Sequence, residues 1–97
     1  MRMLVLTDAA AEAVRAIVGS SEDAAETGGL RVVAEPEGDR VTLQFNVAVV
    51  PAEDDDVVEE SGARVFLEPV AASLLDDKLL DASLDGDNIA FLLTDQA

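Results

Sequence analysis

The sequence has no cysteine, histidine, tryptophan or tyrosine at any of its 97 positions. The absence of Cys and His excludes thiolate-bound metal clusters, imidazole metal sites, cysteine nucleophiles and histidine bases from these residues. Basic residues are also few, six against 21 acidic ones, which gives a formal net charge of −15. Because nucleic acids and anionic membranes attract basic patches, we expect this acidic protein to bind neither nucleic acid nor membrane.

Long apolar runs are missing as well. The longest has five residues, Ile89 to Leu93, which is too short to cross a membrane. Met1 to Leu6 is too short for the apolar part of a signal peptide, and Asp8 follows it, so we expect a cytoplasmic location. What is present is an apolar fraction of 49%, which is too high for a disordered chain. The length predicts a single domain over residues 1–97 with one modest core.

The first half of the sequence alternates between strand and helix patterns. Residues 3–6 form a short apolar run that is typical of a strand, and Thr7-Asp8 supplies a helix N-cap. An apolar stripe at helical spacing predicts an amphipathic helix that ends near Gly19. The stripe consists of Ala10, Val14, Ile17 and Val18.

Residues 30–35 and 41–49 predict a hairpin around the turn signal Pro36-Glu37-Gly38-Asp39. The second of these strands has the clearest alternation in the sequence. Its apolar side chains on one face are Val41, Leu43, Phe45, Val47 and Val49. We expect Leu43, Phe45 and Val47 to point into the core and to pack against the first helix through Val14 and Ile17.

The second half continues with short strands. Residues 57–60 and 64–67 predict a hairpin about Ser61-Gly62, and Glu68-Pro69 opens a short helix over 70–75. Residues 79–84 and 89–93 predict a final pair of strands around the turn 85–88. The fold class predicted by this order is α+β, mainly β, with two helices covering sheet faces.

The sequence contains only weak candidates for a metal, phosphate or catalytic site. Glu53 to Glu60 contains six carboxylates, which are ligands for a hard cation such as Ca²⁺, but the spacing lacks the pattern of an EF-hand and fits a solvated loop better. Asp76-Asp77 and Asp85-Gly86-Asp87 have the same interpretation. Gly28-Gly29 has no phosphate-loop pattern around it, so we attribute the pair to backbone freedom. Lys78 has no catalytic serine at a matching spacing.

We therefore predict no catalytic, no cofactor-binding and no metal-binding residues, and no cofactor. The protein is not expected to be an enzyme. A small enzyme that uses a carboxylate pair stays open as a third interpretation, because pairs among 21 acids cannot be judged without geometry.

Several short motifs in order resemble one family. Leu6-Thr7-Asp8-Ala9-Ala10, Gly29-Leu30-Arg31-Val32, Gly62 to Pro69 and Leu79-Leu80-Asp81 are similar to segments of the A-type iron–sulfur carrier family, also called HesB-like. The resemblance covers the whole sequence. It implies a HesB-like sandwich of two mixed β-sheets with two helices, a homodimer in many members, and a role in carrying or inserting iron–sulfur clusters.

In the family, that role depends on three cysteines, one in a Gly-rich loop after the second strand and two in a C-terminal Cys-Gly-Cys. Here Pro36-Glu37-Gly38-Asp39 occupies the loop, and Asp95-Gln96-Ala97 ends the sequence without the terminal pair. Carboxylates are poor substitutes for thiolates toward iron and sulfide. We therefore expect a cysteine-free divergent member that acts as an accessory or interaction protein, with a protein partner in iron–sulfur assembly. The alternative is a carboxylate-based metal-binding protein.

Overall fold

Two mixed β-sheets form the framework of the computed structural model, which describes residues 3–86 and 88–96. The larger sheet has the strand order β3-β2-β5-β4, with only β2 and β5 parallel. Its strands are β2 (Gly29–Glu37), β3 (Arg40–Ala48), β4 (Asp56–Glu60) and β5 (Ala63–Leu67). The smaller sheet has the order β1-β6-β7, in which β1 and β6 are parallel. It consists of β1 (Val5–Leu6), β6 (Lys78–Asp85) and β7 (Asn88–Asp95).

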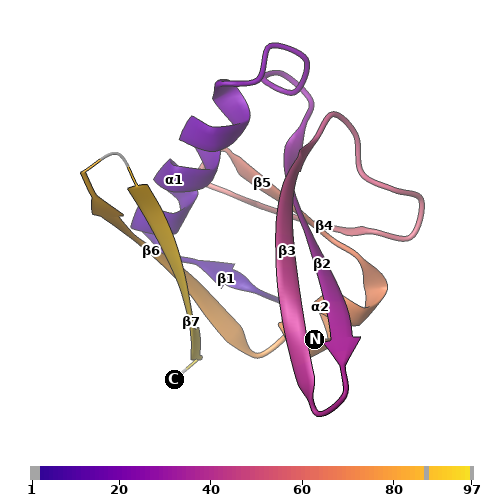
Figure 1. Ribbon diagram of the computed structural model, residues 1–97. Coiled ribbons are helices and arrows are strands. Elements are labelled where there is room, and N and C mark those ends of the chain that lie inside the picture. The colour runs from indigo at the N-terminus through magenta and orange to yellow at the C-terminus, as the bar shows by residue number, and fades with distance from the viewer. Residues whose placement is uncertain (1–2, 87, 97) are drawn as a thin grey trace.

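Two helices begin at capped positions that the sequence marks. The Thr7 hydroxyl accepts a hydrogen bond from the Ala10 amide at 3.1 Å and starts α1 (Asp8–Gly19). Glu68 caps α2 (Pro69–Leu74) in the same manner, with Pro69 in the first turn. Helix α1 contacts β6 of the smaller sheet and both β5 and β2 of the larger one, so it lies between the two sheets (Figure 1).

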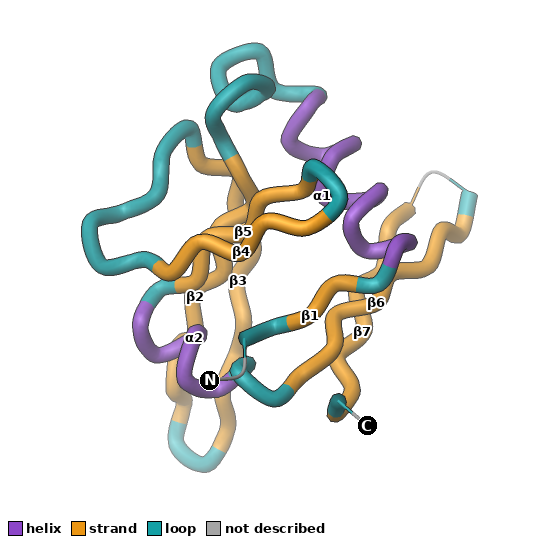
Figure 2. Tube along the Cα trace, turned by 180° about the vertical axis from the view of Figure 1, so that it is seen from behind, coloured by secondary structure: helices purple, strands orange, loops and turns teal. Residues whose placement is uncertain are grey.

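The sheets are closed against each other on two further sides. Strands β3 and β7 lie on the side that faces the viewer in Figure 1. The ring of Phe45 in β3 stacks on that of Phe91 in β7, with centroids 5.4 Å apart. On the opposite side, seen in Figure 2, the Leu6 amide of β1 donates to the Glu60 carboxylate at the end of β4 at 2.7 Å. The predicted α+β, mainly β sandwich of two mixed sheets with two helices is therefore confirmed.

The core lies around β2 and β5, beneath α1. Phe66, 1% exposed, is the bulkiest of the fully buried side chains, but it lies outside the cluster that joins the two sheets, on the face of β5 opposite to Val65 and Leu67. The others are Leu4, Val14, Leu30, Val32, Val65, Leu67 and Leu80. These residues come from β2, β5, β6 and α1 and from the segment before β1, so the core joins both sheets.

The expected packing of the long strand is wrong in part. Val47 is 39% exposed, and Leu43 and Phe45 are only half-buried at the margin of the core. The main contacts of α1 are with β6, β5, β2 and β1, not with β3. The reason is that β3 is an edge strand of its sheet, and alternation indicates which residues share a face but not how deeply that face is covered.

The predicted turn after β2 is also shorter than expected. Only Gly38 and Asp39 form the loop, because Glu37 already pairs with Arg40. Gly38 has a φ of +61°, the left-handed conformation that tight hairpin loops require. Pro36 is tolerated within β2 because β5 pairs with β2 only as far as Val32, so no strand lies beside Pro36 on that side.

Candidate functional site

The end of the molecule that holds the β2–β3 turn is the first place to examine, because the resemblance puts a cluster cysteine in this loop. The acidic side chains here are Glu35, Glu37 and Asp39, and all three are exposed. The end of β7 lies at the same end of the molecule (Figure 1). Within residues 3–86 and 88–96, no three acidic side chains come together in a way that could hold a metal ion.

The acidic stretch 53–60 is divided by the fold. The Asp55 side chain is fully buried and receives two hydrogen bonds from Arg31, at 2.8 and 3.0 Å. It also accepts from the Ala52 amide at 2.9 Å. The hydrogen bond from Arg31 lowers the pKa of Asp55, against the opposing effect of burial. Asp55 therefore fastens the loop before β4 to the middle of the larger sheet.

The other acids of the stretch point elsewhere. Glu60 accepts the hydrogen bond from Leu6 described above and joins the two sheets. Asp54, Asp56 and Glu59 are exposed. This arrangement fits a mostly solvated stretch with two structural carboxylates better than a converging cation site, and its second half forms strand β4.

Glu68 is a structural carboxylate with two backbone hydrogen-bond donors, only one of which the sequence indicates. Its Oε1 accepts from the Ala71 amide at 2.8 Å, which caps α2, and from the Ala34 amide of β2 at 3.2 Å. Burial alone would raise the pKa of Glu68, but the amides of Ala71, Ala34 and Val70 together hold it below its usual value. The Glu-Pro pair signals the helix start, yet nothing in the sequence points to β2 as the second donor.

Asp81 has a similar role at the start of α1. It accepts from the Thr7 hydroxyl at 2.7 Å and from the Ala82 amide at 2.8 Å, and the bond from Thr7 lowers its pKa. Thr7 thus caps α1 and holds β6 at once. Leu79-Leu80-Asp81, one of the motifs that carried the family resemblance, is therefore used here to fix the helix to the smaller sheet.

The remaining candidates of the sequence are ion pairs or turns. Asp76 is exposed, and Asp77 lies 3.5 Å from Lys78. Lys78 also pairs with Asp95, which lowers the pKa of Asp95. Asp85 ends β6 opposite Asn88, and Asp87 lies outside the described residues.

The Gly28-Gly29 pair is explained by close packing, and the attribution to backbone freedom is wrong. Neither residue has a positive φ. A Cβ on Gly28 would lie 2.5 Å from the Ala48 carbonyl oxygen, and one on Gly29 would lie 2.7 Å from that of Arg64. The glycines therefore let the start of β2 approach its neighbours.

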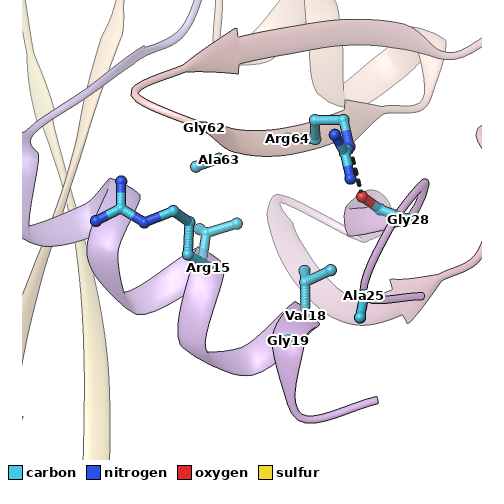
Figure 3. Close-up of a pocket in the computed structure, with 9 residues that line it drawn as sticks. Arg15, Val18, Gly19, Ala25, Gly28, Gly62, Ala63 and Arg64 are labelled. Carbon is cyan, nitrogen blue, oxygen red and sulfur yellow. Dashed lines mark hydrogen bonds between the residues drawn. The ribbon is translucent and has the colours of Figure 1, made fainter. Parts of the chain in front are cut away.

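A pocket of about 180 Å³ opens between α1, the loop after it and the β4–β5 turn. Small and aliphatic residues line it together with Arg15 and Arg64 (Figure 3). Arg64 donates to the carbonyl oxygens of Gly28 at 2.8 Å and Glu26 at 2.7 Å. The Arg15 guanidinium points away from the pocket, toward the Ser61 carbonyl that it binds. Among the described residues, no carboxylate, hydroxyl or thiol lines the pocket.

The sequence and the fold were compared with those of known proteins. No protein-family profile matches the sequence. The uncharacterized protein blr1755 of Bradyrhizobium diazoefficiens is 32% identical over 90 residues, which cover 92% of this chain and 83% of that protein.

Solved structures resemble the fold closely. SufA of Escherichia coli, which is involved in the biosynthesis of iron–sulfur clusters, has a TM-score of 0.77 and 26% identity over 95% of this chain and 84% of its own. IscA, solved with a [2Fe–2S] cluster, has a TM-score of 0.69 and 20% identity over 96% of this chain and 82% of its own. A protein from Aquifex aeolicus, solved in solution by NMR, has a TM-score of 0.69 and 23% identity over 99% of this chain and 94% of its own. The last two likenesses concern the fold alone.

The fold is that of an A-type iron–sulfur carrier, built here without a single cysteine in 97 residues. The chain belongs to one family with blr1755, and it has the A-type carrier fold without any cysteine. No helix among the described residues is long and apolar enough to span a membrane.

Proposed function

We propose that this protein is an accessory or interaction protein of iron–sulfur assembly that does not hold a cluster with these 97 residues and is not an enzyme. The observation that carries the proposal is the combination of a carrier fold with the complete absence of cysteine. Iron–sulfur clusters are held by thiolates, with histidine as the common substitute, and the sequence has neither residue.

The acidic side chains support the same proposal. Asp55, Glu60 and Glu68 each accept hydrogen bonds that fix parts of the fold. Iron bound at these carboxylates would compete for oxygens that already hold strands and helices in place. Hard carboxylate oxygens also match a sulfide-bridged iron centre poorly. A role through protein contacts needs none of these groups to change partners.

The proposal is tested by chemical reconstitution. The protein, purified without oxygen, is incubated with ferrous iron and sulfide and then desalted, and IscA serves as the positive control. We expect no visible absorbance band and no iron to remain with the chain. A cluster retained in stoichiometric amount through gel filtration would overturn the proposal.

Two further arms separate the rival interpretations. Reconstitution repeated with glutathione tests for an external thiol as ligand, and we expect the same negative result. Titration calorimetry with Fe²⁺, Mg²⁺ and Ca²⁺ tests the carboxylate-based alternative, for which a saturable heat near one ion per chain would be the signature. For the interaction role, we expect the fluorescently labelled protein to bind SufA or IscA, and absence of binding to both would count against it.

A further inference from the structure

A second hollow opens between α1 and the hairpin of β6 and β7, and its volume is about 230 Å³. An apolar cavity of ~150 Å³ already accommodates a benzene ring, so this hollow has room for a large apolar side chain. Its lining is apolar apart from one carboxylate. We call it the α1–hairpin groove, and it is lined by Ala9, Glu12, Ala13, Ala16, Ala82, Leu84 and Ile89.

The hairpin forms one wall of the groove and carries an unusually exposed leucine. Leu84 is 73% exposed, more than any other large apolar side chain among the described residues. It pairs in register with Ile89 of β7, and Ala82 lies on the same face of β6. Single exposed apolar residues are common, but one on the wall of an apolar groove is typical of a binding surface.

Helix α1 forms the other wall with small side chains. Ala9, Ala13 and Ala16 follow one another along the helix over about two turns, or ~10 Å. Small side chains allow a second helix to approach closely, because the distance between helix axes depends on the side chains at the contact.

The place of the groove also indicates the form of its occupant. The groove lies between the side chains of a helix and the face of a sheet, not along the edge of a strand, so it offers no backbone ladder to an extended peptide. A segment that binds there has to satisfy its own backbone groups, as an α-helix does.

Charge restricts the chemistry of that helix. Glu12 is exposed and forms no salt bridge among the described residues. Asp8, also exposed, lies one turn earlier on the same side of α1. Arg15, the basic residue of α1, instead binds the Ser61 carbonyl (Figure 3). An apolar groove with carboxylates at its rim is complementary to a basic amphipathic helix.

We propose that the α1–hairpin groove binds an amphipathic helix of a partner protein. This helix places a large apolar side chain against Leu84 and a lysine or arginine opposite Glu12. The inference goes beyond the proposed function, since the groove selects its partner by shape and charge in whatever process that partner acts. Cluster reconstitution and helix binding are separate measurements, so the failure of one does not imply the failure of the other.

The first test uses a labelled peptide of leucine and lysine, about four helical turns long, with its leucines at helical spacing. The control peptide has the same composition in strict alternation, so it keeps the charge but has no apolar helix face. Binding to the full chain is measured by fluorescence anisotropy at moderate salt, which weakens diffuse attraction. We expect saturable binding of the helical peptide and none of the alternating one.

The second test locates the site with exposed substitutions. Leu84→Ala should weaken binding of the helical peptide at least ~10-fold, because it removes the apolar wall. Glu12→Gln should weaken it about 3-fold, as expected for a charge at the rim. Leu74→Ala on α2, where Leu74 is 43% exposed, and Glu59→Gln on β4 are the matched controls and should leave binding unchanged. Circular dichroism verifies folding, and Glu12→Lys, with an expected loss of about 10-fold, is the second variant should Leu84→Ala not fold.

Three results would overturn the proposal. Equal binding of the two peptides would mean that charge attracts them without a helix site. Equal losses in Glu12→Gln and Glu59→Gln, with none in Leu84→Ala, would place the peptide elsewhere on the acidic surface. The third is the absence of saturable binding, including the case in which a second copy fills the groove and Leu84→Ala weakens self-association in sedimentation.

Discussion

Strands β5 and β3 belong to the same sheet and are both rich in apolar residues, yet only β5 is central to the core. β5 has neighbours on both sides and contacts α1, and four of its five residues are buried. β3 has one neighbour, and none of its residues is fully buried. The difference shows that strand order in the sheet, more than the apolar pattern of a strand, decides how much each side chain contributes to stability.

The largest expected effect comes from replacing one phenylalanine on each strand by alanine. Phe66→Ala should reduce the free energy of unfolding by about 3–5 kcal/mol, because Phe66 is 1% exposed and leaves a cavity. Phe45→Ala should cost about 1–2 kcal/mol, from partial burial and the lost stacking on Phe91. Urea denaturation of both variants measures the difference. Equal losses would show that β3 is as much a core strand as β5.

Glycines give the next contrast, again between a packed position and the hairpin tip. Gly28→Ala should destabilise by about 2–3 kcal/mol, because the added Cβ would lie 2.5 Å from a backbone oxygen. Gly38→Ala meets nothing within 4 Å and should cost about 1 kcal/mol, for its positive φ alone. Thermal and urea unfolding of the two variants decide the order, and a reversed order would contradict the close-packing explanation.

Neighbouring acids in one loop offer a third contrast. Asp55→Asn should reduce the free energy of unfolding by about 1–3 kcal/mol, because it weakens a buried carboxylate that Arg31 binds twice. Asp54→Asn, at an exposed position, should change it by less than about 0.5 kcal/mol.

The pH dependence gives this prediction a sign. Folding lowers the pKa of Asp55, so its contribution is present above the unfolded pKa, near 4, and is lost as pH falls through the folded value. The gap between wild type and Asp55→Asn should therefore be full at pH 6 and shrink in acid. A gap that stayed constant with pH would mean that shape, not charge, accounts for the loss.

Much of this fold can be predicted from the sequence because its signals are local. The Thr7 cap, the hairpin turn within Pro36 to Asp39 and the alternation of β3 each depend on a few adjacent residues. The structure confirms the cap and the alternation, and it shortens the turn to Gly38 and Asp39. The identity of the buried phenylalanine could not be predicted in this way. Phe45 lies in the clearer pattern, but the burial of Phe66 follows from the parallel pairing of β2 with β5, which joins segments far apart in the sequence.

The same limit applies to the carboxylates. Composition shows that acids are abundant, and most acids of the stretch 53–60 are exposed, although Asp56 to Glu60 form strand β4 and not a loop. Composition does not show that Asp55 and its neighbour Asp54 differ. Asp55 binds Arg31, which is 24 residues away in the sequence, whereas Asp54 is exposed. Nor does it show that Glu68 reaches β2. A structural carboxylate is recognised by hydrogen-bond donors that are far away in the sequence. A single sequence does not show which of these donors the fold brings close.

The smallest expected effect concerns the repulsion among the acidic side chains, including those of residues 53–60. Because the net charge is −15, the acidic side chains of the folded protein repel one another, and added salt screens this repulsion. We expect the free energy of unfolding to rise by about 1 kcal/mol or less between low and moderate ionic strength, equally for NaCl and KCl. CaCl₂ at matched ionic strength should give the same curve if the acidic side chains of residues 53–60 are solvated and bind no cation. Measurements at two protein concentrations separate this effect from dimerisation, which depends on concentration. An excess stabilisation by calcium that saturates, and that disappears in Asp54→Asn/Asp56→Asn while the structural Asp55 is kept, would instead identify a cation site in the loop.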